Sequence, residues 1–356
     1  MLMPLVLLLI AIFLTAAFLT GCSPLYVVRA AYEEGKILLG RESIPDVIAD
    51  PSTSPEVREK LELVMRARNF AESIGLSAGE SFTQYSHIEK DVLAWVMLAC
   101  KKDAFEPYTW WYPVVGTVPY KGYFEKEDAE CDVNRLEQRG YEVWIRGTEA
   151  FSTLGWFNDP VLTTTIKHEG HDVANTVIHE IFHQTVWIPG SVDFNESAAN
   201  VIGNLGAITF FEQELSQCTE EECRAKAMAL LEGAKRNWEI EKELGTVLTE
   251  VKQSLEALYS SEATSVEKIA KRDEVFLQSV SAFNEKYPKA KVLRELNNAA
   301  ILQLFIYRKE LPLFESLFLK CNSDWSCFLG KLRQIAKAEA PDPYTMLKES
   351  MLKESQ

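Results

Sequence analysis

Apolar side chains recur at helical spacing through residues 240–283, which restricts this part of the chain to helix. The positions are Ile240, Leu244, Val247, Val251, Leu255 and Leu258, and then Val266, Ile269, Phe276, Val280 and Phe283. Residues three and four apart share one face of an α-helix. The polar stretch YSSEATS interrupts the pattern, so the sequence predicts two long helices folded back as an antiparallel hairpin.

Other helices are expected N-terminal to this hairpin. In STSPEVREKLELV a serine precedes a proline and an apolar stripe, which predicts a capped helix over about residues 54–74. Residues 173–186 and 196–214 also have helical spacing. Most of the chain is therefore predicted to be helical.

The pattern changes between residues 82 and 150. Short apolar or aromatic runs (VLAWVMLACK, YTWWYPVVGTVPYKGYF and YEVWIRG) are separated by glycine and proline, which predicts strands. Pro113 and Pro119 restrict any strand in the aromatic run to a sheet edge, and a packed loop is the alternative. EKEDAECDVNRLEQRGY has helical spacing and suits a helical crossover between two strands.

The fold class expected is α+β, predominantly α-helical, with a small mixed sheet and a C-terminal helical hairpin. Residues 22–210 are expected to hold the N-terminal helices and the sheet, and residues 211–340 a helical region packing on them. Residues 341–356 read as a polar, disordered tail. The net charge of −15, from 52 acidic and 37 basic residues, makes nucleic acid a poor candidate partner.

Residues 1–21 contain no charged side chain and lead into LTGC, which predicts a secretion signal. The tetrapeptide ending at Cys22 resembles a bacterial lipobox, so Cys22 is expected to become the lipid-carrying N-terminus of a periplasm-facing envelope lipoprotein. Ser23 favours the outer membrane by the same resemblance. The basic residue that usually precedes such a run is missing, which leaves an uncleaved membrane anchor, a misassigned start or a plain buried helix as alternatives.

Six cysteines remain if Cys22 carries lipid, an even number in an oxidising compartment. The short spacings CTEEEC and CNSDWSC favour the pairs Cys218–Cys223 and Cys321–Cys327. Cys100 is then left for Cys131. Sequence alone does not prove this connectivity.

The segment ANTVIHEIFHQTVW carries two histidines four residues apart. On a helix His179 and His183 project from one face, where their ring nitrogens can converge on one ion. Zinc suits imidazole ligands, and a catalytic zinc site has three protein ligands and one open position. Glu180, beside the first histidine, is placed to take a proton from a zinc-activated water molecule.

A third ligand is expected from PGSVDFNESAAN, which turns and then begins a second helix. Glu196 is the natural candidate, and Asn200, four residues later on the same face, is predicted to hydrogen-bond the free ring nitrogen of a ligating histidine. HExxH is a short pattern that also occurs by chance, and the alternative is a helix with two ordinary histidines. The uncharged apolar neighbours Val177, Ile178, Ile181 and Phe182 favour a buried site.

The chain resembles a bacterial family of predicted zinc aminopeptidases, a gluzincin-like group that includes many lipoproteins. The resemblance runs from LLGRESIPDVIADPSTSPEVREKLELVMRARNFA through WYPVVGTVPYKGYF, GYEVWIRGTEAFSTLGWFNDPVL and VIHEIFHQTVWIPGSVDFNESAANVIG to ELNNAAILQLFIY and LPLFESLF. It implies a zincin-like metallopeptidase core, with His179, His183 and Glu196 as zinc ligands and Glu180 as general base.

Two positions depart from this family. Phe151 stands where the family has tyrosine, so no oxyanion-stabilising hydroxyl is assigned there, and Asn200 replaces serine or threonine. In zincin architecture a strand before the metal helix lines the substrate cleft, which would place Trp156, Asn158 and Asp159 near it. Asp159 is then a candidate for binding a free α-amine, and a cap for a following helix is the alternative reading.

His168 and His171, in the polar segment IKHEGHD, are expected to lie in a solvated loop rather than in a second metal site. The function expected is a zinc-dependent peptidase acting on peptides, with aminopeptidase action favoured by the resemblance. An envelope endopeptidase or processing protease would use the same ligands. A non-enzymatic lipoprotein with structural zinc is the remaining alternative, although no cysteine or further histidine lies nearby to fill a fourth position.

Overall fold

The computed structural model describes residues 35, 37–112, 116–148, 158–288, 296–338 and 340–352. Its helices are α3 (Ile44–Ala49), α4 (Pro55–Ser73), α5 (Lys126–Gln138), α6 (Thr163–Ile166), α7 (Gly170–Thr185), α8 (Val192–Gln217), α9 (Glu221–Tyr259), α10 (Ser265–Lys286), α11 (Asn298–Ile306), α12 (Leu311–Lys320), α13 (Trp325–Lys337) and α14 (Pro343–Leu352). Its strands are β1 (Arg41–Ser43), β2 (Gln84–Ser86), β3 (Ala94–Lys101), β4 (Trp110–Tyr112), β5 (Gly116–Val118), β6 (Tyr120–Tyr123), β7 (Tyr141–Thr148) and β8 (Val161–Leu162). The predicted class, mainly helical α+β with small mixed sheets, is confirmed.

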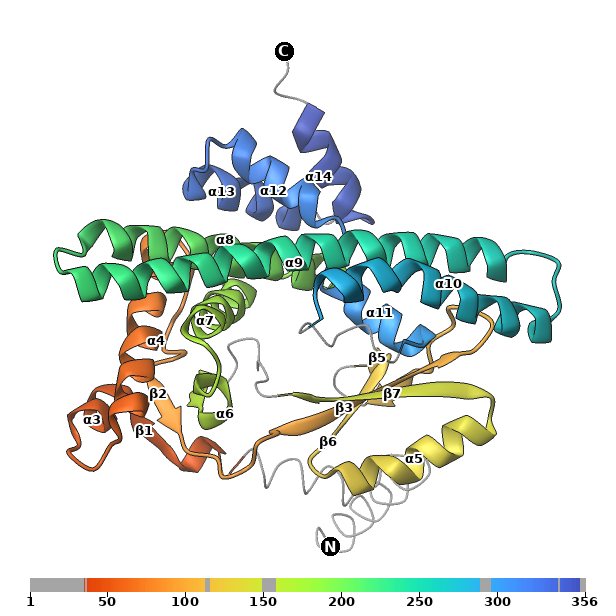
Figure 1. The fold of residues 1–356 in the computed structure, drawn as a ribbon, viewed down its shortest axis with the longest axis horizontal. Coiled ribbons are helices and arrows are strands. Elements are labelled where there is room, and N and C mark those ends of the chain that lie inside the picture. The colour runs from red at the N-terminus through yellow and green to blue at the C-terminus, as the bar shows by residue number, and fades with distance from the viewer. Residues whose placement is uncertain are drawn as a thin grey trace, which may run out of the picture.

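The two longest helices, α8 and α9, run side by side across the molecule (Figure 1). Helices α12, α13 and α14 lie on one side of this pair, whereas α7 and the sheet that contains β3 lie on the other. Helices α9 and α10 form the predicted hairpin, and α10 begins with a capping box in which Thr264 and Glu267 bond each other's backbone N–H groups. The helix expected over 54–74 is α4, capped by Ser54, whose side chain accepts from Val57 N.

The sheet nearest the site has the strand order β6-β3-β7, with β3 antiparallel to both neighbours. Strands β6 and β7 are therefore parallel to each other, and α5 is the predicted helical crossover between them. Helix α5 packs on the face that carries Met97 and Ala99, while α11 packs on the opposite face. Strand β7 forms one edge of this sheet.

Two smaller sheets complete the strand content of the described residues. Strands β1, β2 and β8 form one of them, with β1 antiparallel and β8 parallel to β2. Strands β4 and β5, from the aromatic run, pair only with each other, in agreement with the restriction that proline places on this run.

The main apolar core lies where α4, α7, α8 and α12–α14 meet. Its fully buried aromatic side chains are Phe182, Phe194, Phe211, Phe314 and Phe328. The domain boundary expected at residue 210 falls inside α8, and residues from both sides of it share this core. The tail expected to be disordered from residue 341 forms α14, because Tyr344 and Leu347 are buried in the same core.

The cysteine pairing is confirmed in two cases and wrong in the third. Cys218–Cys223 and Cys321–Cys327 are disulfides, whereas Cys100 and Cys131 are free. Successive residues of a strand face opposite sides of a sheet. Cys100 therefore points away from the Ala99 face covered by α5 and packs near Ala299 of α11, while Cys131 is exposed on α5.

The expected signal segment and Cys22 lie outside the described residues. Among the residues described, no helix is long and apolar enough to cross a membrane.

Candidate metal centre

Helix α7 presents both histidines of the HExxH motif on one face. The opposite face anchors the helix, because Val177, Ile178, Ile181 and Phe182 are almost completely buried in the main core. Helix α8 lies unusually close to α7: a Cβ added at Gly203 would lie 3.0 Å from the Asn175 carbonyl oxygen and 3.2 Å from the His179 Cβ. The lack of a side chain at this position therefore lets the two helices approach each other at the site.

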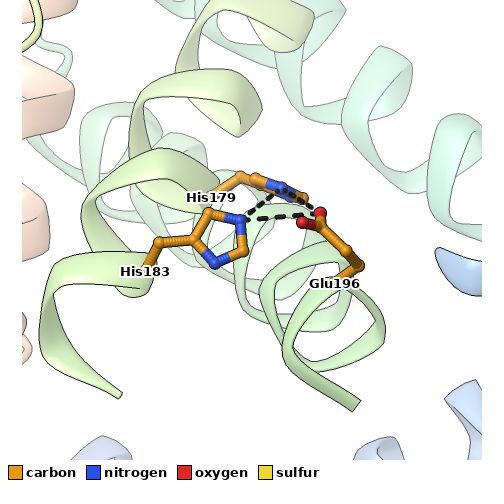
Figure 2. A group of neighbouring side chains, drawn as sticks. All are labelled: His179, His183 and Glu196. Carbon is orange, nitrogen blue, oxygen red and sulfur yellow. Dashed lines mark hydrogen bonds and ion pairs between the residues drawn. The ribbon is translucent and has the colours of Figure 1, made fainter. Parts of the chain in front are cut away.

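Glu196 occupies the second turn of α8 and points at the two histidines (Figure 2). Its Oε2 atom lies 3.5 Å from His179 Nε2 and 3.6 Å from His183 Nε2. The two Nε2 atoms are 3.2 Å apart. The helix–turn–helix between residues 170 and 217 thus brings the three predicted ligands together, and among the described residues this is the group of histidine, cysteine and carboxylate side chains that could hold a metal ion.

The spacing of these three atoms fits a tetrahedral zinc ion. Zinc bonds to nitrogen and oxygen of about 2.0–2.1 Å place neighbouring ligand atoms of a tetrahedron about 3.3–3.4 Å apart. The three observed separations, 3.2, 3.5 and 3.6 Å, are close to that value. The donor set, two imidazoles and one carboxylate, is also one that zinc accepts with a fourth position left open.

The charge around the histidines favours a cation. Burial alone would lower the pKa of His179, but the hydrogen bond and negative charge of Glu196, together with the charges of Glu180 and Glu241, raise it. Burial alone would raise the pKa of Glu196, but its contacts with His179 and His183 hold it at about 2. Glu196 is therefore an ionised carboxylate that is stabilised by positive charge at this place.

A cavity of about 420 Å³ opens beside the site and is lined by both His179 and Glu180. The Oε2 atom of Glu180 is buried and has no hydrogen-bond partner among the described residues. Since an unsatisfied buried carboxylate oxygen is costly, this atom is poised to bond a group that enters the cavity.

Tyr307, the residue that ends α11, faces the same cavity. Its ring stacks near His179, with 6.5 Å between ring centroids. Burial, followed by the negative charge of Glu196, raises the pKa of Tyr307 well above its usual value. The hydroxyl therefore stays protonated, and because it accepts from Arg146 Nη2 at 3.5 Å, its own proton remains available for donation.

The hydrogen bond predicted from Asn200 to a histidine is not formed. The Asn200 Nδ2 group donates to Glu241 and to the Tyr307 carbonyl, and its Oδ1 accepts from Asn204. Asn200 instead ties α8 to α9 and to the end of α11. His183 Nδ1 is buried without a partner among the described residues, and the ring packs edge-on against Trp187.

Two of the three residues expected near the cleft are among those that the structure describes. Trp156 lies outside the described residues, and neither Asn158 nor Asp159 lines the cavity. Asp159 is buried, its backbone is bonded to Ser81 and Phe82, and Leu162 occupies the N-cap position of the helix that follows, so Asp159 is not the cap of that helix. The strand that does line the cavity is β7, which contributes Trp144, Arg146 and Thr148.

The solvated loop predicted for His168 and His171 is only partly correct. His171 lies in the first turn of α7 and its ring packs against α9, where a Cβ added at Gly233 would lie 2.7 Å from Nδ1. His168, just before the helix, lines the cavity. Sequence analysis missed that this polar segment forms the first turn of α7, where the lack of a side chain at Gly233 of α9 leaves room for the His171 ring.

Three cavity residues far from the HExxH motif were also missed: Arg146 on β7, and Gln303 and Tyr307 at the C-terminal end of α11. A signal for all three existed, because Arg146 lies in GYEVWIRGTEAFSTLGWFNDPVL, and Gln303 and Tyr307 lie in ELNNAAILQLFIY, two of the stretches that carry the family resemblance. Asn297 and Asn298 of that stretch have structural roles: Asn297 caps α11, and Asn298 bonds Lys101 and Tyr259.

The fold and site define a mainly helical α+β protein with a three-residue candidate metal centre at the wall of a cavity. The chain matches the model of the family described as "Putative aminopeptidase" over residues 25–347 and belongs to this family. The description of the family points to peptidase activity. Neither the curated proteins nor the solved structures gave a match to this chain.

Proposed function

We propose that this protein is a zinc-dependent aminopeptidase. The observation that carries the proposal is the convergence of His179, His183 and Glu196 at the wall of a cavity, with the free carboxylate oxygen of Glu180 beside them. Membership of the aminopeptidase family supports the choice of reaction.

His179, His183 and Glu196 would hold the zinc ion, which when bound supplies Lewis-acid polarisation and lowers the pKa of a coordinated water to about 7. Glu180 accepts a proton from the attacking water at its buried Oε2 atom and later gives a proton to the leaving amine. The apolar packing around α7 fixes the positions of both histidines and of Glu180, and it places His179 and Glu180 on the cavity wall.

Tyr307 supplies a hydrogen bond to the oxygen of the scissile carbonyl as negative charge develops on it. Its raised pKa keeps the donor proton in place, and its position near His179 brings the hydroxyl to the site. Such donors act in the transition state more than in the ground state. Tyr307 thus takes the role that sequence analysis left unassigned when Phe151 replaced the family tyrosine.

The edge strand β7 supports a peptide as substrate. Trp144, Arg146 and Thr148 alternate along it and line the cavity, so the strand runs along the cavity wall. Within the described part of the chain, no strand pairs with the outer edge of β7. An extended peptide can add to such an edge through its backbone hydrogen bonds.

Metal content tests the first half of the proposal. The full-length chain, purified in detergent without a histidine tag, should contain about one zinc per molecule by elemental analysis, and His183→Ala should contain almost none. His87→Ala is a matched control, because His87 lies outside the site and bonds Thr163. A His183→Ala protein that retains the zinc of the wild type would rule out this ligand set.

Hydrolysis tests the second half. We expect the wild type to hydrolyse amino-acid anilides in preference to peptides with a blocked N-terminus, and Glu180→Gln to keep zinc but lose at least about 100-fold in kcat. Cleavage of blocked peptides alone would replace the aminopeptidase with an endopeptidase. Full activity in Glu180→Gln would refute the role of Glu180.

We also propose that the chain is a lipoprotein of the bacterial envelope, anchored through Cys22 and facing the periplasm. The uncharged run before LTGC supports this proposal. Cells that express the wild type should incorporate labelled palmitate into the protein and hold it in the membrane fraction. Cys22→Ser should lose the label, whereas Cys131→Ser should not; label retained by Cys22→Ser would contradict the proposal.

A further inference from the structure

The cavity beside the metal centre contains polar groups that the proposed chemistry does not use. One wall is β7, with Arg146, and another is the C-terminal end of α11, with Gln303. Tyr307 lies between them: its hydroxyl accepts from Arg146 Nη2, and it follows Gln303 by four residues, one helical turn. The two unused groups therefore border the same space.

Gln303 is a buried amide without a partner. Its exposed fraction is 6%, it lines the cavity, and among the described residues its side chain has no hydrogen bond. An amide can donate two hydrogen bonds and accept two. A polar ligand atom in the cavity would satisfy it.

Arg146 is a half-buried cation without a carboxylate partner. Its guanidinium carbon lies 5.9 Å from the centroid of the Tyr307 ring, and its Nε is buried without a partner. The next arginine of the cavity, Arg308, is in contrast paired with Glu241 at 2.8 Å. In a chain with a net charge of −15, no described acidic residue forms an ion pair with Arg146. A guanidinium binds a carboxylate through two parallel hydrogen bonds, so the ligand that suits Arg146 is a carboxylate.

We propose that Arg146 and Gln303 bind a carboxylate of the peptide substrate. This inference rests on the proposed peptidase function and narrows its substrate class to peptides with a carboxylate close to the scissile bond. The Tyr307 ring lies between Arg146 and His179: its centroid is 5.9 Å from the guanidinium carbon of Arg146 and 6.5 Å from the centroid of the His179 ring. Since an extended chain spans about 3.3–3.6 Å per residue, the carboxylate belongs to a residue within one to three positions of the scissile bond.

Such a carboxylate has two sources, the C-terminus of a short peptide and an acidic side chain. Two substrate pairs separate them: the dipeptide Ala-Ala against its amide, and Ala-Glu amide against Ala-Gln amide. We expect the wild type to prefer the charged member of at least one pair by about 10- to 100-fold in kcat/KM, the range for a hydrogen-bonded charge. Preference in the first pair identifies a C-terminal carboxylate, and preference in the second an acidic side chain.

The variants Arg146→Gln and Gln303→Leu test the assignment. Arg146→Gln should abolish the preference by slowing the charged substrate alone, Arg146→Lys should restore part of it, and Gln303→Leu should reduce it several-fold. Arg66→Gln is the matched control, because Arg66 is an exposed arginine paired with Glu214. An equal loss on charged and uncharged substrates in Arg146→Gln would mean that Arg146 only positions Tyr307, and would overturn the inference.

Binding to a variant that cannot turn over separates this inference from the proposed function. In the Glu180→Gln background, the dissociation constant of each charged peptide and its uncharged partner is measured by calorimetry. A preference that disappears in Glu180→Gln/Arg146→Gln supports the carboxylate site even if the wild type hydrolyses no peptide, in which case the peptidase proposal alone fails. Equal binding of charged and uncharged peptides, or binding of none, refutes the carboxylate site.

Discussion

Gly203→Ala tests whether the packing of two helices sets the geometry of the metal centre. The added Cβ would lie 3.0 Å from the Asn175 carbonyl oxygen, closer still to Asn175 Oδ1, and 3.2 Å from the His179 Cβ. Because the carbonyl belongs to the backbone, α7 must retreat by about 0.4 Å to reach an ordinary contact of 3.4 Å. Metal sites tolerate distance changes of only about 0.2 Å.

The expected result is a loss of metal affinity in a protein that still folds. Alanine is favoured over glycine within a helix by about 0.5–1 kcal/mol, whereas overpacking costs about 1–3 kcal/mol, so the unfolding free energy should fall by no more than about 2.5 kcal/mol. Displacing His179 against Glu196 should lower zinc affinity about 10- to 100-fold, as loss of a supporting contact does.

The assay is competition for zinc with a chelator of known affinity, with urea unfolding measured in parallel. Gly206→Ala is the matched control one turn along α8, because its Cβ would meet the side chain of Ile178, at 2.9 Å, rather than backbone. Gly330→Ala, with nothing within 4 Å of the added Cβ, should leave zinc affinity unchanged. Wild-type zinc affinity in Gly203→Ala would refute the reasoning.

Three further predictions follow from individual side chains. Tyr307→Phe should retain zinc but lose about 100- to 1,000-fold in kcat on amino-acid anilides, and an unchanged kcat would remove Tyr307 from the reaction. Arg272→Met should lower the unfolding free energy in urea by about 3–5 kcal/mol, because it leaves Glu142, 2.8 Å away, as an unpaired buried charge; a change below about 1 kcal/mol would contradict this. A thiol reagent should label Cys131 in the native protein but Cys100 only after unfolding, as followed by mass spectrometry. The reason is that burial, followed by the charge of Glu142, raises the pKa of Cys100 to about 12. Native labelling of Cys100 would show that β3 opens.

Local patterns in the sequence were sufficient for the long helices and for the group of side chains that could hold a metal ion. Apolar spacing of three and four predicts α4, α7, α8 and the α9–α10 hairpin, since each helix buries one face whatever its partner is. The ligand group is also local: His179 and Glu196 are seventeen positions apart and joined by one turn, so helical geometry and a short connection bring them together. The same holds for the disulfides, each of which closes a loop of six or seven residues.

Contacts between distant segments were decided only by the tertiary structure. Cys100 and Cys131 could not be separated on the sequence, because their pairing depends on which face of β3 is covered by α5. Residues 343–352 were predicted to be a disordered polar tail, yet Tyr344 and Leu347 are buried, and Met346 and Met351 pack against the same core, once α12 and α13 are in place.

The cavity shows the same division most clearly. Arg146 and Tyr307 are 161 positions apart, and neither belongs to a pattern that would join them on the sequence. They meet because β7 lies at a sheet edge while α11 packs on that sheet and ends beside α7. Short-range periodicity therefore determined which side chains could hold a metal ion, whereas long-range packing, which no local pattern encodes, decided which side chains line the cavity beside them.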